Sequence, residues 1–186
     1  MTLAETASTF CETMISDALL ANAQSREERL NLLETSLIAS TQVIVDITSR
    51  FLFEKEVFER RERAELSADE LCEIMFRSQK NTYGEGLDEA YLHEYMWTWK
   101  PHYYSTTLSF YNFPYAFGLL FGLGLYSIYL RRGARFISDY ESLLASTGER
   151  TPLELGSRFG IDIKKPTFWR DSLKTIEQRV EQYVAL

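Results

Sequence analysis

The chain has 186 residues, of which 45% are hydrophobic and 14% aromatic, enough apolar material for a core of ordinary size. The net charge is −7, and no run of Lys and Arg is longer than a pair. Because contacts of Lys and Arg to phosphates dominate nucleic-acid affinity, this composition argues against nucleic acid as a partner.

The cysteines and the N-terminus indicate the compartment. Cys11 and Cys72 are far apart and form no Cys-x-x-Cys pattern, which argues against a disulfide framework and against a thiolate zinc site. The N-terminus has no basic segment before an apolar run, so it does not resemble a secretory signal. We therefore expect a cytoplasmic protein, with both cysteines as small buried apolar groups.

Apolar residues recur at helical spacing along most of the chain, and no convincing alternating strand pattern appears. This predicts an all-α fold with one helical domain over residues 1–186. We expect helices over about 2–21, from after Ser25 to about Arg60, from after Ser67 to near Gly84, over 87–99, 114–130 and 136–144, from Pro152, and at the C-terminus. Three starts match the capping-box pattern: Ser25 with Glu28, Ser67 with Glu70, and Thr151 with Pro152 and Glu154.

Two of these helices carry a predicted packing stripe. In the long second helix the stripe consists of Leu30, Leu33, Leu37, Ile44, Ile47, Phe51 and Phe58. In the terminal helix it consists of Trp169, Leu173, Ile176, Val180 and Tyr183.

Residues 103–130 contain no charged side chain, and Arg131 and Arg132 follow directly. A membrane span with a basic flank shows this pattern. The first half is polar, however, so the purely apolar part is too short to span comfortably. We favour a buried helix in which Gly118, Gly122 and Gly124 allow a neighbouring backbone to approach closely. We expect no membrane association.

The first candidate site is on the first predicted helix, where Glu5, Ser8, Thr9 and Glu12 share one face. One interpretation is a solvated polar face, with Glu5 as the capping partner of Thr2. The other is a metal ligand at Glu5, with Glu12 as an outer carboxylate that orients histidine ligands. The spacing alone does not choose between them.

The second candidate site is the aromatic segment that starts at Pro101. An imidazole at His102 and several phenols could donate hydrogen bonds to a peptide carbonyl and to the oxyanion that forms when it is attacked. The alternative is an aromatic core cluster whose hydroxyls bond to the backbone. We assign no role to His93, which we expect on or near the surface of a helix.

Three pieces of the chain, taken in order, resemble the thimet oligopeptidase and oligoendopeptidase F family of zinc endopeptidases. They span nearly the whole sequence, and the second is the most specific. The pieces are Ala4-Glu5-Thr6-Ala7-Ser8-Thr9 with Glu12; Pro101-His102-Tyr103-Tyr104 with Phe110-Tyr111-Asn112-Phe113-Pro114-Tyr115-Ala116-Phe117-Gly118; and Gly148 to Pro152-Leu153-Glu154-Leu155, then Gly160-Ile161-Asp162-Ile163, Pro166 and Phe168-Trp169.

The resemblance implies the C-terminal part of a larger, helical, zincin-type peptidase that hydrolyses internal bonds of short peptides. It implies Glu5 as the third zinc ligand, and His102, Tyr111 and Tyr115 as groups that bind substrate and stabilise the oxyanion. Tyr104 is a weaker candidate. The family also uses a His-Glu-x-x-His helix for two zinc ligands and the general base, and this sequence has no such motif.

Several expectations follow from the missing motif. One carboxylate is too few for a catalytic zinc, so zinc would belong to the intact enzyme and this chain alone would be an inactive fragment. An apolar surface exposed by truncation would permit self-association. Two other classes stay open: a non-catalytic helical module that binds peptides or a protein partner, and a membrane protein built on residues 103–130.

Overall fold

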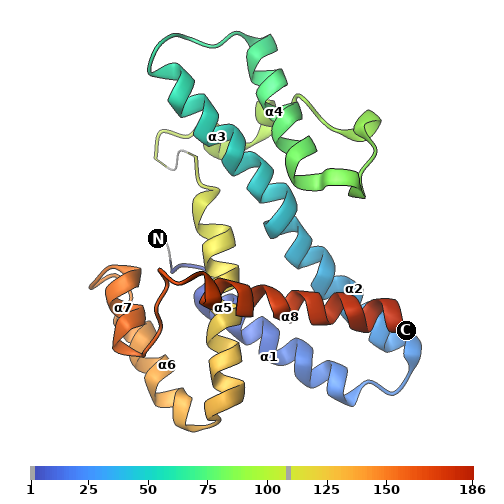
Figure 1. Ribbon diagram of the computed structural model, residues 1–186, viewed down its shortest axis with the longest axis vertical. Coiled ribbons are helices and arrows are strands. Elements are labelled where there is room, and N and C mark those ends of the chain that lie inside the picture. Colours follow the sequence, from blue (N-terminus) through green and yellow to red (C-terminus); the bar gives the residue numbers. More distant parts are fainter. Residues whose placement is uncertain (1–2, 108–109) are drawn as a thin grey trace. The chain divides into compact units, whose positions relative to one another are not determined.

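The computed structural model describes residues 3–107 and 110–186, which form helices joined by turns and short loops (Figure 1). Within these residues there is no β-strand, only an isolated bridge between Thr147 and Arg150, so the all-α prediction is confirmed. The α-helices are α1 Thr6–Asn22, α2 Arg26–Thr41, α3 Thr48–Arg61, α4 Ala68–Tyr83, α5 Phe113–Arg132, α6 Arg135–Ala145, α7 Pro152–Arg158 and α8 Pro166–Ala185.

The chain divides into two compact units. Unit 1 comprises the residues up to Ser40 together with Phe117–Leu186, and unit 2 comprises Thr41–Ala116. Each unit has its own hydrophobic cluster and is described by itself below. A single domain over residues 1–186 stays a prediction.

Unit 1 is built around the Phe117–Arg132 part of α5, with α1, α6, α7 and α8 grouped about it (Figure 1). Aromatic rings join these helices: Phe10 of α1 stacks on Tyr140 of α6 at 4.3 Å between centroids, and Phe121 of α5 lies 5.7 Å from Phe168 of α8. The buried members of the cluster are Leu3, Phe10, Phe121, Leu125, Tyr126, Ile128, Phe136, Leu143, Leu155 and Ile161.

The glycines of α5 are points of close contact. Backbone atoms of a neighbouring segment approach Gly118 and Gly122, as predicted, whereas side chains approach Gly124. A Cβ atom added at Gly118 would lie 2.6 Å from Cβ of Glu5, and one at Gly122 would lie 2.9 Å from Cβ of Thr9. A Cβ at Gly124 would lie 2.4 Å from the Phe168 ring of α8. Since real Cβ atoms do not approach other heavy atoms this closely, glycine is what lets α5 pass against the start of α1 and against α8.

Two helical segments, Arg26–Arg61 and Phe113–Arg132, are long and apolar enough by length and composition to cross a membrane. The expectation that the uncharged stretch is too short is therefore wrong for α5 by this measure. Core helices of soluble proteins pass the same test, and half of the most apolar window of α5 is buried inside the protein. We keep the interpretation of a buried core helix, and the lack of membrane association stays a prediction.

The terminal helix α8 packs differently from its predicted stripe. Leu173 and Val180 are 41% and 45% exposed, whereas Ser172 and Arg179 are buried. The Arg179 guanidinium donates to Ser36 of α2 and, at 3.0 Å, to Asp17 of α1. The predicted stripe is wrong at two of its positions because the buried Arg179, paired with the partly exposed Asp17, fixes the face of α8 that turns inward.

Unit 2 is centred on α3 and α4, which run antiparallel (Figure 1). The buried hydrophobic cluster of this pair consists of Phe53, Val57, Ile74 and Met75. The Arg77 side chain of α4 also donates to Glu56 of α3 at 2.5 Å. At the start of α4 the capping box between Ser67 and Glu70 is present, and Thr151 and Glu154 form another at α7, both as predicted.

The start of α2 departs slightly from the predicted box. The Ser25 hydroxyl accepts from the backbone N–H of Glu28 at 3.1 Å, but the Glu28 carboxylate accepts from the backbone N–H of Gln24 and not from that of Ser25. The helix still begins directly after Ser25, at Arg26.

The predicted long helix is continuous, but residues Gln42–Ile47 form a π-helical turn, η1, that joins α2 to α3. A π turn holds an extra residue, so the side chains that follow it are rotated relative to a regular α-helix. Phe51 and Phe58 are 41% and 55% exposed, whereas Phe53 and Val57 are buried. The predicted stripe is therefore wrong beyond the π turn.

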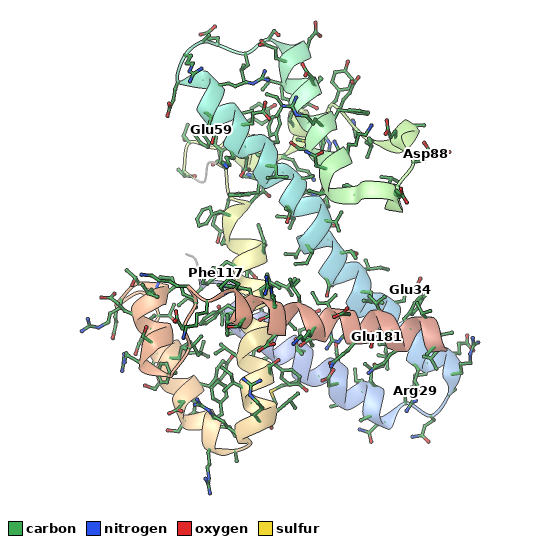
Figure 2. All side chains as sticks on the ribbon, viewed as in Figure 1. Arg29, Glu34, Glu59, Asp88, Phe117 and Glu181 are labelled. Atoms are coloured by element: carbon green, nitrogen blue, oxygen red, sulfur yellow. The ribbon has the colours of Figure 1, made fainter. Side chains whose placement is uncertain are left out.

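Residues 87–99, predicted as a helix, form no α-helix. They contain two short 3₁₀ turns, η3 Glu89–Tyr91 and η4 Met96–Trp99, and Asp88, labelled in Figure 2, caps the first of them. The segment is held to α4 by Gln79, whose amide donates to the carbonyl of His93 and accepts from its N–H. Tertiary hydrogen bonds thus replace a helical ladder, and His93 lies exposed between η3 and η4.

Candidate functional site

The first candidate site residue, Glu5, belongs to unit 1 and is half-buried directly before α1, in the N-cap position. Its carboxylate makes no capping bond to the helix backbone. The Ser8 hydroxyl donates to it at 3.3 Å and to the Glu5 carbonyl at 3.0 Å. Because Gly118 of α5 packs against Cβ of Glu5, the backbone of this residue is held by close contact. Its predicted capping partner Thr2 lies outside the described residues.

The rest of the predicted polar face is mixed. Glu12 is exposed, seven residues after Glu5, and Thr9 packs against Gly122. Leu3 and Phe10 are buried. Of the cysteines, Cys72 is buried as predicted, whereas Cys11 is exposed, so the prediction is wrong for Cys11.

The residues described here do not by themselves fit a zinc site. Among residues 3–107 and 110–186, no group of three or more His, Cys, Asp or Glu side chains could hold a metal ion. Catalytic zinc sites take three protein ligands, and Glu5 offers one. The role of Glu5 as a ligand and of Glu12 as its supporting carboxylate therefore stays a prediction.

The second candidate site belongs to unit 2, where the structure brings His102, Tyr111 and Tyr115 together. The backbone N–H of Tyr111 donates to Nδ1 of His102 at 3.1 Å, and the rings of Tyr111 and Tyr115 meet edge to face at 5.7 Å. Because Nδ1 accepts this bond, the neutral imidazole carries its proton on Nε2. The arrangement therefore leaves Nε2–H as the imidazole donor, on a residue whose Nδ1 is held by the backbone of Tyr111.

The loop that carries His102 closes on itself. His102 is in the short 3₁₀ turn η5, Pro101–Tyr103, and its carbonyl accepts from the N–H of Phe110 at 3.1 Å. Phe110 has a φ of 53°, a left-handed conformation that is costly for a residue with a bulky side chain. Tyr104, the weaker candidate, is exposed and donates to the carbonyl of Trp97 at 3.2 Å.

A carboxylate that the sequence interpretation missed lies beside His102. Glu54 of α3 is 3% exposed, and its Oε1 lies 3.8 Å from Nδ1 of His102. The Asn112 amide donates to Glu54 and also lies 3.4 Å from the Tyr103 hydroxyl. The signal that could have found Glu54 is its position between Phe53 and Val57, a carboxylate among buried positions of a helix.

Burial and charge set the pKa values at this site. Burial raises the pKa of Glu54 to about 7, although hydrogen bonds from Asn112 and Tyr103 and the charge of Arg50 act in the opposite direction. Burial lowers the pKa of His102, and the nearby cations Arg50 and Lys100 lower it further. The imidazole is therefore a neutral donor at neutral pH.

A cavity of about 250 Å³ also belongs to unit 2. Its lining residues are mostly apolar and aromatic. Two of these residues, Tyr103 and Tyr104, directly follow His102 in sequence. The charged side chains of Arg61 and Glu65 complete the lining. Cavities of this kind suit an apolar side chain with a polar group nearby. The aromatic lining residues are Phe53, Trp97, Tyr103, Tyr104 and Phe110.

Comparison with known proteins connects these features to a family. No protein-family model matches the chain. Oligopeptidase PepF of Bacillus subtilis (strain 168) is 23% identical over 181 residues, which is 97% of this chain. The crystal structure of oligoendopeptidase-F from Enterococcus faecium matches 99% of this chain with a TM-score of 0.86 and 22% identity. The chain resembles the oligoendopeptidase F family in sequence and fold.

The resemblance to oligoendopeptidase F that was drawn from the motifs is thereby confirmed, and so is the all-α fold class. The chain is much shorter than these relatives. It covers 27% of the length of PepF and 35% of the oligoendopeptidase-F chain. At 22% identity the structural match establishes the fold, and the roles of individual residues are a separate question.

Proposed function

We propose that this chain is part of a zinc metalloendopeptidase that, as an intact enzyme, hydrolyses internal bonds of short peptides. The observation that carries this proposal is the similarity to oligopeptidase PepF along 97% of the chain. The fold shared with oligoendopeptidase-F supports it. The enzyme would work in the cytoplasm on peptides, with no nucleic acid or membrane as a partner.

Within that enzyme, Glu5 would be the third ligand of the zinc ion, and Glu12 would support it. The bound zinc would polarise the scissile carbonyl and the attacking water. The other two ligands and the general base would come from a His-Glu-x-x-His motif, which this sequence lacks. This chain alone therefore should not be active.

The groups of unit 2 would act on the substrate itself. His102 has its Nδ1 occupied by the N–H of Tyr111, so its Nε2–H is the donor for a peptide carbonyl or an oxyanion. The phenols of Tyr111 and Tyr115, whose rings meet edge to face, would be further donors. Fixed donors of this kind stabilise the charge that develops during attack and need little reorganisation.

A peptidase assay tests the proposal. The purified chain, supplied with zinc, should leave an internally quenched fluorogenic oligopeptide intact, whereas a longer product of the same gene that contains His-Glu-x-x-His should cleave it. Chelation of zinc should abolish that cleavage, and Glu5→Gln should lower it by about 100-fold or more, since the loss of a ligand disrupts the metal site.

The matched control is Glu34→Gln, because Glu34 is an exposed carboxylate of α2 that is labelled in Figure 2. Its activity should equal that of the unaltered enzyme. Zinc-dependent cleavage by the pure chain would contradict the predicted inactivity, and equal effects of the two substitutions would contradict the ligand role of Glu5.

A second candidate function is a non-catalytic module that binds peptides, and the aromatic cavity of unit 2 favours it. Calorimetric titration with a short peptide that carries a Phe side chain would detect such binding. Tyr104→Ala should weaken it, because Tyr104 lines the cavity, whereas Tyr91→Ala should not, because Tyr91 is exposed outside it. Binding without peptidase activity in the longer gene product would favour this candidate.

Self-association is also proposed, through apolar side chains at the surface of unit 1. Ile15 and Leu19 of α1 are 61% and 49% exposed, one helical turn apart. Apolar side chains that group on a helix face favour contact with a second molecule. Analytical ultracentrifugation should show dimers that weaken in Ile15→Ser, and a monomer at all concentrations would refute the idea.

A further inference from the structure

The two ends of the loop that carries His102 converge on Glu54. Tyr103, next to His102, has its hydroxyl 3.4 Å from the Asn112 amide, and Asn112 donates to the Glu54 carboxylate. Asn112 is only 2% exposed. Asn112 directly follows Tyr111, whose N–H donates to Nδ1 of His102, and Tyr103 directly follows His102. Glu54 therefore holds the sequence neighbour of each residue in that hydrogen bond.

Glu54 is energetically unfavourable at this buried position. Burying a carboxyl group costs free energy unless its oxygens are paired, and its raised pKa reflects this cost. The nearest Arg of α3, Arg50, is bound to Asp46, so no Lys or Arg forms an ion pair with Glu54 among the residues described. An apolar residue between Phe53 and Val57 would pack here without that cost.

The hydrogen bonds of the loop explain what the carboxylate contributes. The loop contains the left-handed Phe110 and would relax without a tertiary anchor. A side-chain acceptor at position 54 fixes Asn112, and Asn112 fixes the backbone N–H of Tyr111. The direction in which His102 presents its Nε2–H then depends on a residue of another helix.

We propose that Glu54 is the positioning residue of His102, holding Asn112 and Tyr103 so that the N–H of Tyr111 stays on Nδ1 and Nε2–H remains the donor. The proposal rests on the proposed function only for the role of Nε2–H as a donor to the substrate. The positioning itself is a property of this chain and can be measured without any activity.

The test uses nitrogen NMR of the two histidines in the purified chain. His102 should be the Nε2–H tautomer, and the Tyr111 amide should be protected from exchange. Glu54→Leu should abolish both features, whereas Glu54→Gln, which keeps an acceptor for Asn112, should retain both. His93 is exposed, its backbone is held by Gln79, and it provides an internal reference that should not change.

Each result of these measurements either supports or overturns the positioning role of Glu54. Retention of the His102 tautomer and of Tyr111 protection in Glu54→Leu would overturn the proposal, and so would equal loss in Glu54→Gln, because the hydrogen-bond acceptor would then not be what matters. If Glu54→Leu fails to fold, Asn112→Ala removes the same anchor from the loop side and should release the Tyr111 amide. Unchanged protection in that variant would also overturn the proposal.

A longer product of the same gene that contains His-Glu-x-x-His would add a measurement of activity. There Glu54→Leu should lower kcat about 10- to 100-fold with KM little changed, because small displacements of a positioned donor cost rate and not ground-state binding. Glu54→Gln should recover most of it. If Glu54→Leu loses the His102 tautomer but the longer gene product has no peptidase activity, the positioning role is supported and only the proposed function is contradicted.

Discussion

The two units hold their candidate site residues by different means. In unit 1, Glu5 is fixed by close packing, because α5 passes its backbone at a glycine. In unit 2, His102 is fixed by a chain of hydrogen bonds that ends on the buried Glu54. Close packing tolerates changes of charge but not of volume, whereas a buried hydrogen-bond network tolerates neither the loss of a partner nor a change of its protonation.

The largest effect should come from adding volume in unit 1. Gly118→Ala would place its Cβ 2.6 Å from Cβ of Glu5, so α1 and α5 must separate. We expect a loss of about 2–3 kcal/mol in the free energy of unfolding, measured by urea denaturation.

The control for that change is Gly86→Ala, because nothing lies within 4 Å of the Cβ it would add. It should alter the free energy of unfolding by less than about 1 kcal/mol. Equal effects of the two alanines would show that close packing does not hold Glu5.

A smaller effect should come from charge in unit 2. The pKa of Glu54 rises from 4.5 to about 7 on folding, so its neutral form is favoured in the folded chain. The stabilisation is therefore fully present below about pH 4.5 and is lost as pH rises through about 7.

The comparison of the protein with Glu54→Gln isolates this contribution, because glutamine does not titrate. Between pH 4.5 and 8 the stability of the unaltered protein should fall relative to the variant by on the order of 2 kcal/mol. A pKa that rises from 4.5 to about 7 corresponds to roughly 3.5 kcal/mol, at about 1.4 kcal/mol per pKa unit, and solvent screening reduces this value. Parallel pH profiles would mean that Glu54 is not buried in its neutral form.

The smallest effect should come from a local cap. Ser67→Ala removes the side chain that accepts from the N–H of Glu70 at the start of α4, and it should cost about 1 kcal/mol. Ser138→Ala, on the exposed face of α6, should be neutral or slightly stabilising because alanine favours helix. If Ser67→Ala cost more free energy of unfolding than Gly118→Ala, local capping would contribute more to stability than close packing.

Features that depend on neighbours in sequence were predicted well. The capping boxes at Ser67 and Thr151 are present, because each needs only residues three positions apart. The glycines of α5 were correctly interpreted as points of close approach, since their spacing in an apolar helix is visible in the chain itself.

Features that depend on distant partners were missed. The helix expected over 87–99 is replaced by turns that Gln79 holds in place, and the stripe of the long helix is displaced beyond η1. In α8 the buried position is Arg179, whose partner Asp17 lies 162 residues away. No periodicity within a helix reports such a partner.

The sequence by itself determined the helical class, most helix starts and the resemblance to oligoendopeptidase F, because spacing, caps and motifs are local properties of the chain. Only the tertiary structure decided that Glu54 belongs with His102, since Asn112, which connects them, is 58 residues away from Glu54. The physical reason is that the cost of a buried carboxyl group, and the hydrogen bonds that offset it, exist only after these segments have packed together.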